Sequence, residues 1–390
     1  MSEIRPLRAY AEVVLGRQRS PAHDQGDHMV PYLRAANVKD GFLDLSDVKE
    51  MNFSPNEQRR YALRPGDVLV TEGSGSLSSV GATSVWSGEL PGTVCFQNTL
   101  LRLRPRSSVS GRFLAWWCRY AFDDGLLAGI ATGANIYHLA AERLRSLPVT
   151  YVQPEAQRAI ADYLDAETAR IDALIAKKRQ LARLLGQRFR DRVRHLMGEL
   201  FDQHGSLPLK RLVQCLDGQR IPVSSTERAQ RTGPYPYYGA SGVVDTIDDY
   251  LFDEELVLLG EDGAQLLDPE YHVAFVVRGK CWVNNHAHVL RPRLADAEFL
   301  ALHLATLDRA PFLSGSTRPK LTQDDMGRIP VPRCDLTVQR QTAMRLSQEE
   351  AQIGELTDRL DRQVGLLREH RQALITAAVS GELQVPGVAA

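Results

Sequence analysis

The sequence has no long apolar run. Nowhere do 18 apolar residues follow one another, so we expect no membrane-spanning helix, and the start lacks the basic-then-apolar pattern of a signal peptide. The five cysteines lie far apart without a CxxC pair, which argues against a disulfide framework or a zinc knuckle. These absences predict reduced thiols and a cytoplasmic location.

The chain also lacks an excess of charge and the common catalytic motifs. Its net charge of −1 means that any nucleic-acid binding must depend on local patches. No P-loop, no GxSxG elbow, no Asn/Asp-Pro-Pro-aromatic motif and no glycine-rich loop of a Rossmann-like unit occurs. The sequence therefore predicts no catalytic residue, and it disfavours a fused methyltransferase or nuclease.

What the chain does contain is an internal repeat. The segment "SLPVTYVQPEAQR" from Ser146 returns 182 residues later as "RIPVPRCDLTVQR" from Arg328, and Gly133 falls on Gly315 at the same offset. Upstream, "GDVLVTEG" resembles "ELVLLGEDG", and "NTLLRLRP" resembles "NHAHVLRP". The period is too long for a solenoid, so the chain reads as two copies of one unit, residues 1–200 and 201–390.

Each copy combines a globular part with a long helix. Short apolar runs between Gly, Pro and Ser predict mixed β-structure with short helices over residues 1–150 and 201–332. Residues 151–200 and 333–390 are rich in Glu, Arg, Ala and Leu and predict one long helix each. Pro154 and Glu155 suit a helix start, and Gly198 suits the end of the first helix.

Apolar residues recur every seven positions along both predicted helices. The main row is formed by Leu164, Ile171, Leu185, Leu346, Ile353, Leu360, Leu367 and Leu374. Leu356 and Val364 add a second apolar row on the second helix. Such a narrow stripe is typical of a coiled-coil seam. We predict an α+β fold in which the two helices form an antiparallel coiled coil with pseudo-two-fold symmetry. The alternative is two unrelated amphipathic helices, each packed on its own domain.

Two divergent globular domains that alternate with two similar long helices resemble the specificity subunit of type I restriction–modification systems. The resemblance is carried by "GANIYHLAAERLRSLPVTYVQPEAQRAIADYLDAETARIDALIAKK" and by "GSTRPKLTQDDMGRIPVPRCDLTVQRQTAMRLSQEEAQIGELTDRLDRQVGLL". Both segments contain the same features in the same order. A Gly-containing loop is followed by a short helix, then by a proline-containing segment that ends the globular part, and then by a Gln at the start of the long helix. The acid expected before that Gln is replaced by Ala156 and Val338.

The resemblance implies two target recognition domains, each reading half of a split site in double-stranded DNA. It also implies that the helices set the gap between the halves and bind two methyltransferase subunits, with restriction and translocase subunits reached through the complex. S-adenosylmethionine, ATP and Mg would lie on those partners, and this chain would bind no cofactor. The alternative function is a non-catalytic coiled-coil adaptor with two ligand-binding heads.

Polar and basic residues at expected loops and strand ends are the candidate DNA contacts. In the first half they are Arg17, Gln18, Arg19, Ser74, Ser76, Ser78, Asn135, Tyr137 and His138. In the second half they are Gln219, Arg220, Tyr237, Tyr238, Asn285, His286, Ser316, Thr317, Arg318 and Lys320. For any single residue, a solvated loop is the competing interpretation.

Two further clusters leave their roles open. Cys281, His286 and His288 match no standard zinc spacing, so we predict no metal and expect a structural role or one at the edge of the DNA. The basic run from Lys177 either pairs with the acids Glu349, Glu350, Glu355, Asp358 and Asp361 or flanks DNA.

Overall fold

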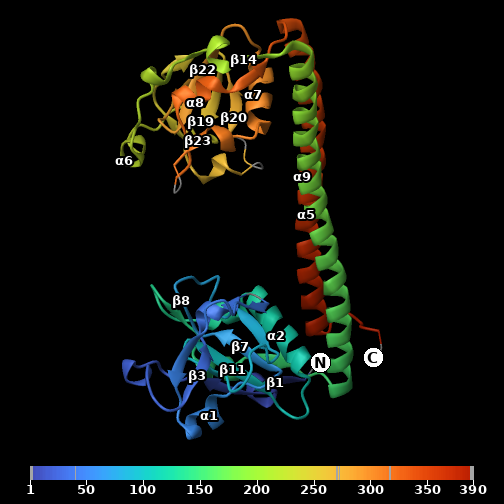
Figure 1. The fold of residues 1–390 in the computed structure, drawn as a ribbon. Coiled ribbons are helices and arrows are strands. Elements are labelled where there is room, and N and C mark those ends of the chain that lie inside the picture. The colour runs from blue at the N-terminus through green and yellow to red at the C-terminus, as the bar shows by residue number, and fades with distance from the viewer. Residues whose placement is uncertain (1–2, 40, 269–270, 272, 316–317, 387–390) are drawn as a thin grey trace. The chain divides into compact units, whose positions relative to one another are not determined.

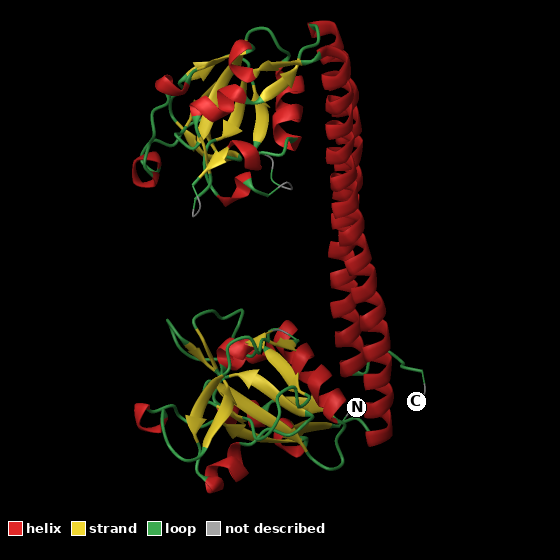
Figure 2. Ribbon diagram, viewed as in Figure 1, coloured by secondary structure: helices red, strands yellow, loops and turns green. Residues whose placement is uncertain are grey.

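The chain folds as two compact units, residues 1–176 with 364–390 and residues 177–363. The computed structural model describes residues 3–39, 41–268, 271, 273–315 and 318–386. Each unit contains one globular head together with a stretch of both long helices, α5 (Pro154–His204) and α9 (Leu336–Ser380) (Figure 1). Both heads mix strands with short helices (Figure 2), in agreement with the predicted α+β class. Among the described residues, no helix combines the length and apolar character needed to cross a membrane.

The first head is a set of small sheets with helices packed on them. Its helices are α1 (Pro55–Tyr61), α2 (Gly111–Asp123), α3 (Leu126–Ile130) and α4 (Ala141–Ser146). Its strands are β1 (Ile4–Pro6), β2 (Ala11–Leu15), β3 (Met29–Leu33), β4 (Val38–Lys39), β5 (Phe42–Leu43), β6 (Lys49–Asn52), β7 (Asp67–Thr71), β8 (Gly73–Ser74), β9 (Thr83–Trp86), β10 (Cys95–Phe96), β11 (Leu100–Pro105), β12 (Tyr137–His138) and β13 (Pro148–Thr150).

The second head is built in the same way. Its helices are α6 (Ser225–Arg228), α7 (Ala297–Thr306) and α8 (Gln323–Arg328). Its strands are β14 (Ser206–Pro208), β15 (Val213–Cys215), β16 (Tyr235–Gly239), β17 (Gly242–Ile247), β18 (Phe252–Asp253), β19 (Leu256–Gly260), β20 (Ala274–Val277), β21 (Lys280–Val283), β22 (Ala287–Pro292), β23 (Leu313–Ser314), β24 (Lys320–Leu321) and β25 (Pro330–Pro332).

The central antiparallel sheet has the same order in both heads. It runs β2-β11-β7-β9 in the first head and β15-β22-β19-β20 in the second. Alternate strand residues point to opposite faces. Val68 and Val70 therefore pack with Phe113 of α2, as Val257 and Leu259 pack with Phe299 of α7. The internal repeat is thus a repeat of topology as well as of sequence.

Each head is closed by pairing its first strand with its last. In the first head, Arg5 of β1 lies opposite Val149 of β13, and Pro6 lies opposite Pro148. In the second head, β14 pairs with β25 in the same way. The repeated Pro-Val segment before each long helix is therefore the final strand of its head. Its prolines lie at sheet edges, where a missing N–H is tolerated.

The two long helices extend somewhat differently from the prediction. Gly198 does not end α5, which continues for six more residues to His204. A Cβ at Gly198 would meet no atom within 4 Å, so this glycine marks neither a turn nor a close approach. The helix ends at Gly205, whose φ of 71° is the left-handed conformation typical of the residue after a helix. The second helix, α9, ends at Ser380, earlier than the predicted residue 390, and Gly381 with a φ of 83° follows it.

Within each unit, α5 and α9 pack antiparallel. In the first unit, Ile171 and Ile175 of α5 contact Val364 and Leu367 near the end of α9. In the second unit, Phe189 of α5 shares a cluster with Leu346 of the early part of α9, and Lys178 donates a 2.6 Å hydrogen bond to Gln363.

The second apolar row does not run through Leu356. That side chain is 46% exposed, whereas Val364 is buried as expected. The residue seven positions before Val364 is Thr357, which is partly buried. A polar residue in the seam concealed the true spacing.

Candidate nucleic-acid interface

A small two-stranded finger on the first head brings two groups of candidate contacts together. Strand β8 pairs with β12, so that Ser74 lies opposite Tyr137 and Gly73 opposite His138 (β8 is labelled in Figure 1). The exposed ring of His138 places its Nδ1 3.2 Å from a carboxylate oxygen of Glu72. Residues more than 60 positions apart in the sequence thus form one polar surface.

The loops beside this finger add further exposed polar groups. Ser76 and Ser78 are both exposed, and their hydroxyl oxygens lie 2.8 Å apart. Asn135 is exposed in a turn that begins at Gly133, where φ is 130° and a Cβ would lie 1.9 Å from the carbonyl oxygen of Ile136. Only glycine fits there, which fixes where Asn135 is presented.

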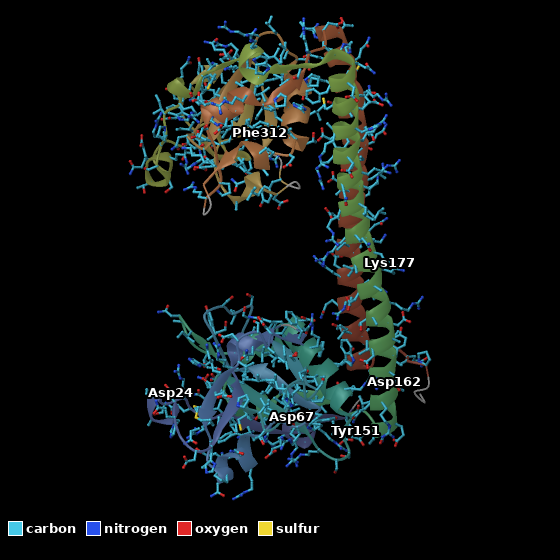
Figure 3. The ribbon with its side chains drawn as sticks, in the orientation of Figure 1. Asp24, Asp67, Tyr151, Asp162, Lys177 and Phe312 are labelled. Carbon is cyan, nitrogen blue, oxygen red and sulfur yellow. The ribbon has the colours of Figure 1, made fainter. Side chains whose placement is uncertain are left out.

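The Arg17–Arg19 segment is divided by burial. Arg17 is only 9% exposed: its guanidinium pairs with Glu57 at 2.7 Å and donates to the carbonyl oxygen of Asn52 at 2.6 Å. Arg17 therefore holds the head together and is not available to DNA. Gln18 and Arg19 are exposed, and Arg19 makes a loose 3.4 Å ion pair with Asp24, which is labelled in Figure 3.

In the second head, several candidate cations converge on the turn after β19, at Glu261 and Asp262. The Glu261 carboxylate pairs with Lys320 at 3.1 Å through one oxygen and with Arg220 at 2.6 Å through the other. The Asp262 carboxylate accepts a 3.0 Å hydrogen bond from Arg318 and lies 3.0 Å from Nδ1 of His286. We call Glu261 and Asp262 the acid turn.

Arg220 belongs to the interior of this group. Besides its pair with Glu261, it donates to the carbonyl oxygens of Ala287 and Asp217, and little of its side chain is exposed. Like Arg17 in the first head, Arg220 therefore holds the fold together. His286, Arg318 and Lys320 lie nearer the solvent and keep exposed surface.

Behind the acid turn lies a buried pair, Asp217 and His288. Nδ1 of His288 is 2.6 Å from the Asp217 carboxylate, and Nε2 is 2.9 Å from the carbonyl oxygen of Leu321. Both ring nitrogens of His288 therefore face acceptor oxygens. Burial alone would raise the pKa of Asp217, but the hydrogen bond and charge of His288 and the N–H of Val289 lower it below its usual range. The pair fixes β24 against β22.

The sequence cluster of Cys281, His286 and His288 does not come together. Cys281 packs in an apolar cluster with Phe252, while His286 and His288 face different carboxylates. Among the described residues, Asp217, Glu261 and His288 do lie close enough to hold a metal ion. The guanidinium of Arg220 already pairs with both of those carboxylates, so a cation is present without a metal.

The remaining candidates of the second head differ in accessibility. Tyr237 is 1% exposed and its hydroxyl bonds to the backbone of Val223, so it belongs to the core. Tyr238 is partly buried against Phe275. Gln219 and Asn285 are exposed and remain available. Ser316 and Thr317 lie outside the described residues.

Sequence reasoning missed the acid turn and an aromatic group on another sheet of the second head. The ammonium of Lys280 lies 4.5 Å from the ring centre of Tyr250, which packs edge-on against Tyr235. The stretch of sequence that could have indicated the aromatic group is "YPYYG". The stretch that could have indicated the acid turn is "GEDG", at the end of an apolar strand.

In the basic run of α5, Lys178 donates to Gln363. Arg194 donates to the carbonyl oxygen of Thr306 and pairs with Asp191 at 2.7 Å. Lys177, labelled in Figure 3, is exposed on the same helix.

The second head and the helix that follows it match a known family. Residues 208–364 fit the family described as "Type I restriction modification DNA specificity domain". Over these residues, the chain is similar to the DNA specificity domain of type I restriction–modification systems. The first head repeats the strand order of this specificity domain, although the match itself covers only the second copy.

Curated relatives agree with this assignment. A Haemophilus influenzae protein named as a type I restriction enzyme specificity subunit is 37% identical over 133 residues, 34% of this chain and 34% of its own. The StySPI specificity subunit of Salmonella potsdam is 27% identical over 169 residues, 43% of this chain and 35% of its own. The chain thus aligns with about a third of the length of these relatives.

A solved structure shares the fold over nearly the whole chain. That structure is described as the structural basis underlying complex assembly and conformational transition of the type I restriction–modification system. The alignment covers 98% of both chains at 18% identity, with a TM-score of 0.66. This likeness confirms the predicted class of two mixed heads with long helices.

Proposed function

We propose that this chain is the sequence-reading subunit of a type I restriction–modification complex, with each head recognising one part of a split site in duplex DNA. The observation that carries the proposal is the specificity domain at residues 208–364 together with its topological duplicate in the first head. Two copies of one recognition fold suit a site with two halves. The divergence of the heads suits halves of different sequence.

The exposed polar residues supply the recognition chemistry. Amide and hydroxyl side chains can bond base edges, and arginine and lysine can neutralise phosphates. In the first head these groups are Gln18, Arg19, Ser76, Ser78 and Asn135. In the second head they are Gln219, Asn285, His286, Arg318 and Lys320.

The chain has no catalytic role in this proposal. Two methyltransferase subunits carry S-adenosylmethionine, and further restriction or translocase subunits carry ATP and Mg. A complex that acts on chromosomal DNA would work in the cytoplasm.

A docking surface for the partners is suggested by exposed leucines on the helices. Leu181 and Leu184 are about half exposed on α5 and are flanked one turn away by the exposed cations Lys177 and Arg188. Leu366, 182 residues after Leu184, is 63% exposed on α9. Leu184 and Leu366 occupy equivalent positions of the internal repeat, so each long helix offers a similar exposed apolar surface. Two similar surfaces suit two copies of one partner.

Two measurements test the proposal. The full chain should bind duplex DNA with an affinity that falls steeply with salt, because cations that neutralise phosphates release counter-ions. Sequencing methylated sites in cells with and without the gene should then reveal a two-part motif that depends on it. A chain that ignores duplex DNA and leaves the methylated sites unchanged would instead be an adaptor. The isolated chain should also fail to bind S-adenosylmethionine in calorimetry.

A further inference from the structure

The acid turn of the second head has no full counterpart in the first. After β19, which ends at Gly260, the chain reads Glu261-Asp262-Gly263, whereas after β7 it reads Glu72-Gly73. Glu261 corresponds to Glu72, since each follows the equivalent central strand and meets a basic residue. Asp262 is the additional acid.

Asp262 neutralises the most exposed cation of the candidate interface. The guanidinium of Arg318, whose side chain is 66% exposed, donates to Asp262 at 3.0 Å. The same carboxylate lies 3.0 Å from His286 and is itself only 18% exposed. One acid therefore occupies two of the groups that the proposed function assigns to DNA.

The backbone that carries this carboxylate is also held in place. Asp262 forms an isolated β-bridge with Lys320, and Gly263 donates its N–H to the carbonyl oxygen of Pro319. Glu261 next to it is anchored on the buried Arg220. The backbone of Asp262 therefore keeps its position relative to Lys320 and Pro319.

We propose that Asp262 is a specificity-determining residue that acts as an internal competitor for the DNA backbone. In the free head it pairs with Arg318 and His286 and repels phosphate, so that duplex of the wrong sequence is bound weakly. Only a site whose bases make further bonds, for example to Asn285, offsets the loss of these pairs. An exposed ion pair is worth at most about 1 kcal/mol, so it can exchange for a phosphate when other contacts form.

The inference rests on the proposed function, since it concerns the same DNA surface. Neutralising one phosphate contributes about tenfold in affinity at ~0.1 M salt, from a slope near 0.9 per contact. Asp262→Asn should therefore bind random-sequence duplex about tenfold more tightly, with a salt slope steeper by about one. The enrichment of a motif from a random duplex library should fall by a similar factor.

A matched control separates this role from a simple change of net charge. Asp245→Asn also removes one acid from the second head and also frees an arginine, Arg228, from an ion pair at 2.9 Å. It should leave both readouts unchanged. Adding Arg318→Gln to the Asp262→Asn variant should remove most of the gain.

The outcomes are distinct. If the wild-type chain binds no duplex DNA, the proposed function itself fails. If the wild-type chain binds and Asp262→Asn binds random duplex equally or more weakly, the competitor role is wrong while the function stands. A gain of equal size in Asp245→Asn would assign the effect to net charge and overturn the inference.

Discussion

Gln157 lies 2.9 Å from the backbone nitrogen of Ser110 and accepts its N–H through the side-chain oxygen, while the amide nitrogen of Gln157 donates to the carbonyl oxygen of Val152. Ser110 is the residue that caps helix α2. Gln339 does the same in the second head, where it accepts from the N–H of Asp296, the cap of α7. The glutamine of the repeated Gln-Arg is thus a buried hydrogen-bonding link between each head and its long helix.

Replacing either glutamine with alanine should destabilise its unit. The loss leaves a buried backbone N–H without its acceptor, which costs about 1–3 kcal/mol. Gln157→Ala and Gln339→Ala should each lower the midpoint of denaturant unfolding. The exposed Gln180 of α5 is the control, and Gln180→Ala should change stability by less than about 0.5 kcal/mol. Equal effects of all three would contradict the assigned role.

The antiparallel pairing of the helices can be tested by charge reversal. Arg371 of α9 lies 3.2 Å from Asp172 of α5 within the first unit. Arg371→Asp and Asp172→Arg should each lower the thermal midpoint, and the double variant should recover about 0.5–1 kcal/mol of the combined loss. Purely additive losses would mean that the two residues are not neighbours in solution.

Exchanging one head should change one half of the recognised site. If residues 1–150 are replaced by the corresponding head of a related chain, sequencing of methylated sites should show one altered half and one unchanged half. The prediction follows from two heads with separate cores, since each closes on its own first and last strands. A change in both halves would contradict independent reading.

Lengthening the helix should alter the gap between the halves. Four residues inserted after Ala176 add about 6 Å of helix, or one to two base pairs at ~3.4 Å per pair. A seven-residue insertion, which preserves the seam register, should widen the gap by about three base pairs with less loss of affinity. Methylated motifs that keep their gap in an active complex would show that the helices do not measure the DNA.

The buried pair of the second head should make its stability depend on pH. The pKa of Asp217 is lowered in the folded state, so its stabilising effect is complete above the ordinary value of about 3.9 and is lost as the pH falls through the lowered value. Asp217→Asn removes the carboxylate that pairs with the buried guanidinium of Arg220 at 3.3 Å and should cost about 3–5 kcal/mol at neutral pH.

Unfolding in urea across a pH series measures the effect. The difference between wild type and Asp217→Asn should shrink between about pH 5 and pH 2. A difference that stays constant would mean that Asp217 is not the titrating group.

The architecture could be predicted because the sequence contains an internal repeat, which shows the same unit twice. Repetition of the Pro-Val strand and the Gln-Arg helix start fixed the order of heads and helices. Details that depend on one residue were less accessible. Gly198 resembled a helix stop, yet a glycine inside a helix costs only about 1 kcal/mol, so the helix can continue through it. Thr357 concealed the seam because it is polar.

The candidate interface was only partly predictable. Arg17, Arg220 and Tyr237 have the right chemistry for DNA contacts, but residue type does not reveal burial, and all three proved to be structural. The β8–β12 finger and the acid turn depend on contacts between distant segments, which no local pattern records.

The pairing of first and last strands has an evolutionary consequence. Because β1 meets β13 and β14 meets β25, the chain enters and leaves each head at a single place. A crossover between genes that falls in the codons flanking these strands would deliver a whole head without disturbing the seam of the helices. A new sequence preference could then arise in one step by exchange of a complete head, and the DNA-binding surface would not have to be rebuilt one mutation at a time.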